Sequence, residues 1–210
     1  MPNRRRDRQR KPARPDAFRD PRPVVLVVCE GIITEPQYIS GFGRAHRNGR
    51  VRVEVAPEHG VPRTVVEAAR NRKRAAEVTA EKHEDDNLAY DSVWCVFDID
   101  QHPNVSDAKQ MALANGIKLA ISNPCFELWL LLHFRDPPGS EDRHTIQARL
   151  SEYITDYNKH VDVEVFLPYY PEAAKRAASL DRLARQVNLP DRNPTTGVYK
   201  LLEEIAAQLQ

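Results

Sequence analysis

Acidic side chains follow two short apolar runs of the sequence. Residues 24–28 are too few and too rich in β-branched side chains for a helix, so they predict a strand buried on both faces, and Glu30 comes just after them. Residues 92–97 predict another strand, which ends in Asp98 and Asp100. Open α/β sheets build their sites at the carboxyl ends of strands, so we expect the three acids to gather there.

This grouping of acids indicates metal chemistry on a phosphate ester. Strand side chains alternate, so Asp98 and Asp100 point to the same side. Clustered carboxylates repel one another unless a cation neutralises them, and hard oxygen ligands suit Mg²⁺ or Mn²⁺. We therefore expect Asp98 and Asp100 to hold the ion, with Glu30 as a further ligand that also activates or orients a water molecule. An exposed, solvated carboxylate pair is the competing interpretation of the D-x-D pattern.

Four further polar residues are candidates for the same site. Glu127 lies in the apolar run 125–134, where a carboxylate is costly unless it is paired or metal-bound. It is either a ligand of a second ion or the partner of an Arg or Lys on a neighbouring helix. His102 could contact a phosphate or act as a general acid, or be a solvated loop residue. Ser122 and Asn123 end a predicted strand and could bind a phosphate or cap the next helix.

Other residues with reactive side chains have structural explanations. His133 is predicted to be a core histidine satisfied by a backbone carbonyl. Cys29, Cys95 and Cys125 lack C-x-x-C spacing, so they predict small buried side chains rather than zinc ligands. Tyr38 would be the nucleophile for topoisomerase chemistry, which we do not expect in a chain without a strand-passage domain.

The elements that would position the acids can be predicted in the first half of the chain. A helix is expected over about 36–46, with Thr34 capping its amides and Gln37 bonding back to Thr34. Residues 51–55 alternate between valine and charged side chains and predict a half-exposed strand. A long polar helix should cover about 64–82.

The second half continues the alternation and then becomes helical. Ser106 should cap a short helix that Gly116 stops, residues 117–121 predict a strand, and 125–134 predict a buried helix. Three more helices are expected, over about 145–158, 171–187 and 195–209. Alternating strands and helices predict an α/β fold with a mostly parallel central sheet flanked by helices, and a helical C-terminal third.

The composition divides the chain into three parts. Residues 1–22 are Arg- and Pro-rich, with nine Lys/Arg against three Asp, and predict a disordered basic arm. Such an arm could contact phosphate backbones or be a solvated tail. Residues 23–136 form the expected α/β core, and residues 137–210 a helical extension packed on it.

The chain as a whole has the composition of a soluble globular protein, with 41% hydrophobic and 29% charged residues. No apolar run approaches the roughly 20 residues of a membrane span, and the basic N-terminus lacks the apolar region of a secretory signal. An odd number of cysteines, three, favours a reducing compartment. We expect a cytoplasmic protein without membrane contact.

Several motifs resemble the RloB family of bacterial defence-associated proteins across about residues 22–210. They are VCEGIITEPQY at 28–38, WCVFDID at 94–100 with His102 following, SNPCFELWLLLHF at 122–134, and NPTTG at 193–197 before an amphipathic helix.

The resemblance implies a Toprim-like fold, the fold of topoisomerases, primases and OLD-type nucleases. It implies that Glu30 is the acid after the first strand and that Asp98 and Asp100 are the D-x-D pair. It also brings Glu35 into the site, where Glu35 and Glu127 would complete a second metal position. The implied function is a metal-dependent nuclease of phage defence, acting on DNA or RNA and working with an ATPase partner encoded nearby.

Two alternatives remain beside the nuclease. The F-D-I-D run also resembles the nucleophile loop of haloacid-dehalogenase-type phosphatases, but it lies mid-chain and has His102 where those proteins carry Thr or Val. A non-catalytic Toprim-like subunit could instead bind nucleic acid or the ATPase. The chain has all of the acidic residues that the nuclease would need, which favours an enzyme over a non-catalytic subunit. The pattern distinguishes neither DNA from RNA nor one oligomeric state from another.

Overall fold

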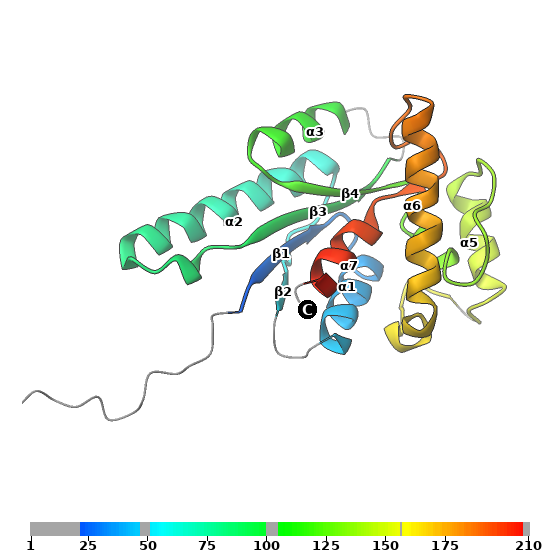
Figure 1. The fold of residues 1–210 in the computed structure, drawn as a ribbon, viewed down its shortest axis with the longest axis horizontal. Coiled ribbons are helices and arrows are strands. Elements are labelled where there is room, and N and C mark those ends of the chain that lie inside the picture. The colour runs from blue at the N-terminus through cyan, green and yellow to red at the C-terminus, as the bar shows by residue number, and fades with distance from the viewer. Residues whose placement is uncertain (1–21, 47–50, 100–104, 156, 208–210) are drawn as a thin grey trace, which may run out of the picture.

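The protein is built around a mostly parallel sheet. The structure, a computed structural model, describes residues 22–46, 51–99, 105–155 and 157–207. Within these residues a five-stranded sheet runs in the order β2-β1-β3-β4-β5 (Figure 1). Its strands are β1 (Val24–Cys29), β2 (Arg52–Val55), β3 (Ser92–Asp98), β4 (Lys118–Asn123) and β5 (Thr195–Thr196). The first four are parallel and β5 is antiparallel to β4, so the predicted α/β fold is confirmed.

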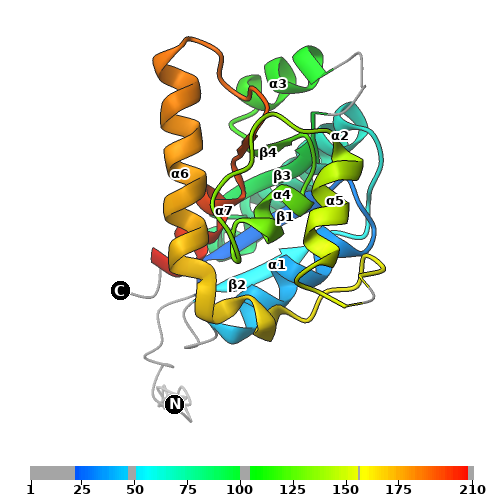
Figure 2. The ribbon, with the colours of Figure 1, turned by 90° about the vertical axis from the view of Figure 1, so that its right-hand side faces the viewer.

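Helices cover both faces of the sheet. The helices are α1 (Thr34–Ala45), α2 (Pro62–His83), α3 (Val105–Ala114), α4 (Glu127–Leu131), α5 (Arg143–Ser151), α6 (Tyr170–Gln186) and α7 (Val198–Ala207). Short 3-10 helices span Asp86–Leu88, Val163–Val165 and Leu167–Tyr169. Helices α2 and α3 pack on one face, and α1 and α7 on the other, with α4, α5 and α6 beyond them (Figure 2).

Strand β1 connects the two apolar clusters of the core. Val25 and Val27 belong to the cluster under α1 and α7, while Leu26 and Val28 belong to the cluster under α2 and α3. All four side chains are fully buried, because alternate strand residues face opposite sides of a sheet that is covered on both. The first strand is therefore fixed firmly where it delivers Glu30 to the edge of the sheet.

The apolar run 125–134 packs against α1 and encloses a buried polar pair. Nδ1 of His133 lies 2.9 Å from the carbonyl oxygen of Trp129, and Nε2 lies 3.0 Å from the hydroxyl of Tyr38. Since a carbonyl only accepts, Nδ1 carries the proton and Nε2 accepts from the Tyr38 hydroxyl. The predicted core histidine is confirmed, and Tyr38 is fully buried, which is unsuitable for a nucleophile.

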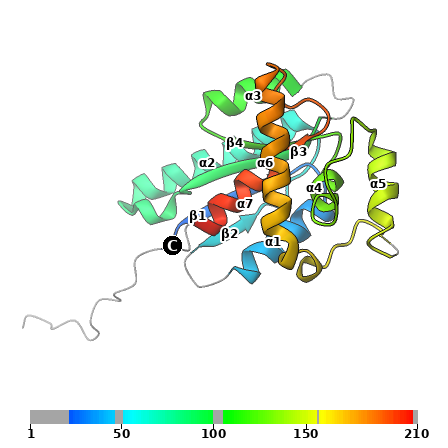
Figure 3. The same cartoon turned by 45° about the vertical axis from the view of Figure 1, so that its right-hand side comes forward.

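The C-terminal helices are joined by a buried carboxylate. Asp181 of α6 accepts hydrogen bonds from the Tyr199 hydroxyl at 2.8 Å and from Arg185, and Lys200 Nζ lies 2.7 Å away. Burial alone would raise the pKa of Asp181, but the bonds from Arg185, Lys200 and Tyr199 lower it overall. This contact holds α6 where it crosses α7 (Figure 3).

The capping prediction for α1 was wrong. Thr34 is already helical and caps nothing with its side chain. Its hydroxyl donates instead to the carbonyl of Lys159, and Gln37 accepts from the amide of Val161. Both side chains therefore bond to a distant segment of the chain instead of to each other.

Other element boundaries also differ from the predictions. The run 125–134 is buried as expected, but only α4 within it is regular helix, followed by turns. Helix α3 begins at Val105, so Ser106 lies inside it, whereas Gly116, at φ 61°, ends it as predicted. The last helix starts at Val198, because the two β-branched threonines before it form β5.

The cysteines agree with the prediction from the sequence. Cys29, Cys95 and Cys125 are buried and unbridged, as small core side chains should be. In the described part of the chain, no helix combines the length and apolar character that a membrane crossing requires.

Stability should fall in mild acid because of His133. Burial lowers the pKa of His133 to about 4, whereas an unfolded histidine titrates near 6.5. Between these values the unfolded chain takes up a proton that the folded chain does not, so the free energy of unfolding decreases as pH falls. We expect His133 to contribute a loss of about 2.5 kcal/mol by pH 4.5.

Urea unfolding of wild type and His133→Gln at pH 7.5 and 4.5 measures this loss. Glutamine keeps a donor and an acceptor but does not titrate, so the variant should lose less stability on acidification. Equal pH dependence in the two proteins would contradict the assignment.

Candidate functional site

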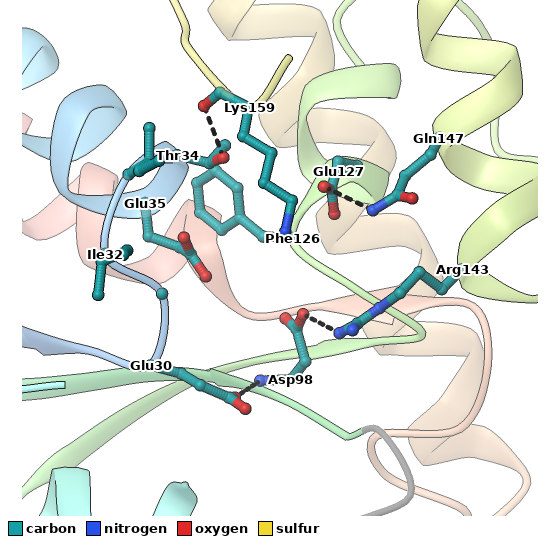
Figure 4. Close-up of a pocket in the computed structure, with 12 residues that line it drawn as sticks. Glu30, Ile32, Thr34, Glu35, Asp98, Phe126, Glu127, Arg143, Gln147 and Lys159 are labelled. Atoms are coloured by element: carbon teal, nitrogen blue, oxygen red, sulfur yellow. Dashed lines mark hydrogen bonds and ion pairs between the residues drawn. The ribbon is translucent and has the colours of Figure 1, made fainter. Parts of the chain in front are cut away.

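A polar pocket of about 340 Å³ opens at the carboxyl ends of β1 and β3 (Figure 4). The parallel register pairs Cys29 with Val96, so β1 ends beside β3, which continues for two more residues to Asp98. Oε2 of Glu30 accepts a hydrogen bond from the backbone amide of Asp98 at 2.9 Å. The two acids that the sequence placed after separate strands therefore meet.

Four carboxylates from four elements line this pocket. Glu30 follows β1, Glu35 is in the first turn of α1, Asp98 ends β3 and Glu127 begins α4. Glu35, Asp98 and Glu127 are buried, with 8%, 7% and 6% of their surface exposed. Asp100 and His102, which the sequence also assigned to the site, lie outside the described residues.

The carboxylates do not yet converge on one point. Across the described ranges, no three His, Cys, Asp or Glu side chains are grouped closely enough to hold a metal ion. In Figure 4 the carboxylate of Glu30 lies against the amide of Asp98, while the carboxylate of Asp98 points toward Arg143. A shared ion would require side-chain rotations around the pocket, with the backbone already in place.

Burial and like charges raise the pKa of two of these acids. Desolvation is the largest cause for Asp98, followed by the charges of Glu35, Glu30 and Glu127, and together they raise its pKa well above the usual range although Arg143 opposes them. Desolvation, then the charges of Glu127 and Glu30, also raise the pKa of Glu35. A cation placed among these groups would relieve the repulsion, so the donor set fits a hard divalent ion.

Two basic side chains face the acids from the C-terminal third. Nη2 of Arg143 lies 3.0 Å from Oδ2 of Asp98. Arg143 is the first residue of α5, which Asp142 caps by accepting from the amide of Thr145 at 3.0 Å. Lys159 also lines the pocket, and its side chain extends inward on the side of Glu35 and Glu127 (Figure 4).

Glu127 is held by neutral partners. Its Oε1 accepts from Nε2 of Gln147 at 2.9 Å and from the Tyr157 hydroxyl at 3.2 Å. Among the residues that the structure describes, no Arg or Lys forms an ion pair with it. The salt bridge expected as the alternative to a ligand role is absent there.

The Glu30-Gly31 turn makes room for Glu35. A Cβ atom built on Gly31 would lie 2.2 Å from Oε2 of Glu35, so that carboxylate rests directly on the glycine backbone. The amides of Glu35 and Gly31 donate to it and partly offset the rise of its pKa. A glycine is needed at this turn because another side chain would displace the second acid.

Ser122 and Asn123 are not part of the pocket lining. The Ser122 hydroxyl is fully buried and lies 3.0 Å from the hydroxyl of Thr196, and Asn123 donates to the carbonyl of Asp191 at 2.8 Å. Both side chains attach the edge strand β5 and the loop before it. The predicted phosphate contact has no support in their positions.

Sequence reasoning missed the residues that come from the far side of the pocket. Asp142 and Thr145 form a recognisable helix start, which could have placed Arg143 at the beginning of a helix. Nothing local marks Gln147 or Lys159, because their approach to the acids depends on how the C-terminal third folds back.

Comparison with known proteins identifies the family. A family model described as RloB-like protein matches residues 25–205. The chain belongs to the RloB-like family. Searches among curated proteins and among solved structures found no match. The matched region begins in β1 and ends in α7, so every residue that lines the pocket lies within the part that defines this RloB-like chain.

Replacing Gly31 should disturb the site without disturbing the fold. In Gly31→Ala the new methyl group must push the Glu35 carboxylate aside, while the backbone at residue 31 needs no positive φ. We expect the free energy of unfolding to stay within about 0.5 kcal/mol and Mn²⁺ affinity to fall about tenfold.

Calorimetric titration with Mn²⁺ and urea unfolding test this expectation. Gly139→Ala is the matched control, since nothing lies within 4 Å of a Cβ atom added there. Unchanged Mn²⁺ binding in Gly31→Ala would show that the position of Glu35 does not matter to the ion.

Proposed function

We propose that this RloB-like protein is a Mg²⁺- or Mn²⁺-dependent nuclease that hydrolyses phosphodiester bonds. One observation carries the proposal: carboxylates delivered by β1, α1, β3 and α4 line a single pocket at the strand ends, together with two basic side chains. Four carboxylates suit a hard metal cation, and the positively charged Arg143 and Lys159 beside them suit an anionic substrate.

Glu35, Asp98 and Glu127 are the described residues that would hold metal, and Asp100 is a further predicted ligand. Their support is chemical: all are carboxylates, the three described ones are buried, and burial together with like charges raises the pKa of Asp98 and Glu35. A bound divalent ion would polarise a phosphoryl oxygen and stabilise the charge that develops on it.

Glu30 is the best placed general base. It is more exposed than the other three acids, and the Asp98 amide holds one of its oxygens at the edge of the pocket. From there it can orient a water molecule and accept its proton. Arg143 and Lys159, on the opposite side, can contact the non-bridging oxygens of a phosphate.

The substrate we propose is nucleic acid, DNA or RNA, with the basic arm at residues 1–22 adding phosphate contacts. A role in phage defence and an ATPase partner belong to the same proposal, and both are supported by the resemblance of the motifs to defence-associated proteins. A non-catalytic subunit that binds nucleic acid or the ATPase is the second candidate, favoured by the separation of the carboxylates.

Neutralising Asp98 should abolish cleavage. Asp98→Asn keeps the size of the side chain but removes a charge that a metal ion needs, so we expect cleavage to fall at least about 1,000-fold. The exposed Asp107 on α3 provides the matched control, Asp107→Asn, which should cleave normally.

Cleavage would be followed on single- and double-stranded DNA and on tRNA, with Mg²⁺, Mn²⁺ or EDTA, with and without the proposed ATPase partner. Metal-dependent products from wild type and none from Asp98→Asn support the nuclease. Binding without cleavage under every condition would favour the non-catalytic subunit.

A further inference from the structure

Helix α1 is joined to a distant stretch of chain that forms one wall of the pocket. This stretch, residues 157–163, is called here the wall segment; it connects the end of the α5 region to the 3-10 helix Val163–Val165. It contributes Tyr157, which donates to Glu127, and Lys159, which lines the pocket. It has little regular structure of its own, so its position depends on side-chain contacts.

Two side chains of α1 supply those contacts. The hydroxyl of Thr34 donates to the carbonyl of Lys159 at 2.8 Å. Gln37 uses both ends of its amide: Oε1 accepts from the backbone amide of Val161 at 3.1 Å, and Nε2 lies 2.9 Å from Nδ1 of His160. Gln37 therefore holds the two residues that directly follow Lys159.

The backbone of the wall segment needs such support. Lys159 has a φ of 72°, in the left-handed region that side chains other than glycine seldom adopt. Residues held in this region persist where the surrounding contacts over-determine them. With the carbonyl of Lys159 fixed by Thr34 and the next two residues fixed by Gln37, the backbone turns so that the lysine side chain enters the pocket (Figure 4).

The far end of the wall segment is fixed by close packing. A Cβ atom on Gly41 of α1 would lie 2.6 Å from Cγ1 of Val163, so the glycine allows the segment to approach the helix closely. Apolar packing thus anchors the end at Val163, and Tyr157 and Val161 also pack against the core. The carbonyl of Lys159 and the two residues after it are held by hydrogen bonds from α1.

We propose that Gln37 is a positioning residue that acts through the wall segment to hold Lys159 over the pocket acids. The inference rests on the proposed function, because it assigns Lys159 a place beside the scissile phosphate. Gln37 does not line the pocket, so we expect its replacement to affect cleavage through the segment that it holds.

Trypsin digestion measures how firmly α1 holds the wall segment, and it does not depend on nuclease activity. Trypsin cuts after Lys159, and the Lys159–His160 bond becomes a better substrate when the wall segment leaves α1. Gln37→Leu removes both hydrogen bonds at nearly constant size, and we expect cleavage at this bond, identified by mass spectrometry, to become about tenfold faster.

Two further variants sharpen the comparison. Gln37→Glu keeps the acceptor for the Val161 amide and should show an intermediate rate. Gln110→Leu, the same substitution on an exposed residue of α3, should behave as wild type. Equal trypsin rates for wild type and Gln37→Leu would overturn the inference.

A double-mutant cycle tests the route to catalysis. Gln37→Leu should lower kcat/KM for nucleic-acid cleavage about tenfold in the wild-type background and have no further effect when combined with Lys159→Met. An equal loss in both backgrounds would overturn the inference, because Gln37 would then act by another route. If wild type cleaves nothing with either metal, the proposed function fails, and the trypsin rates alone decide whether Gln37 holds the segment.

Discussion

Repulsion among buried carboxylates is the constraint on which the pocket depends. Asp98 is buried and has the charges of three other acids around it, and burial makes each of those interactions stronger. Such a cluster persists only where surrounding groups compensate for it. Arg143 compensates directly at 3.0 Å, and the amide of Asp98 does so for Glu30 at 2.9 Å. The polar surroundings of the pocket are therefore a requirement of the acids themselves.

The sheet can hold the acids together because its own stability comes from apolar packing away from the pocket. The residues of β1 face two separate apolar clusters, and its neighbour β3 is buried throughout. Their register is thus fixed by core packing, which brings Glu30 beside Asp98 whatever the charges prefer. Gly31 then lets the chain turn closely enough for α1 to bring Glu35 to the same place. The free energy of core packing therefore compensates for the repulsion among the acids at the edge of the sheet.

Local patterns predicted the sheet and the acids but not their partners. Apolar runs gave the strands, and the position of Glu30 and Asp98 after two of them was enough to predict that they meet. The wrong cap at Thr34 shows the limit, because its hydroxyl bonds a residue 125 positions away. Arg143 is likewise 45 positions from Asp98. Contacts of this range depend on how the C-terminal third folds back, which neither periodicity nor turn chemistry determines. The predicted roles of Asp100 and His102 concern residues outside the described ranges.

The charges that line the pocket also imply an order of binding in the proposed reaction. Four carboxylates and two basic side chains give the described lining a formal charge of −2. Proton uptake by the acids with raised pKa values makes this charge less negative. A phosphodiester, itself negative, is repelled from such a site. One divalent cation would bring this formal charge to zero, and Arg143 and Lys159 could then contact a phosphate without net repulsion from the site. In the proposed reaction the acids would therefore bind the ion first, and the basic residues from the C-terminal third would contact the phosphate afterwards.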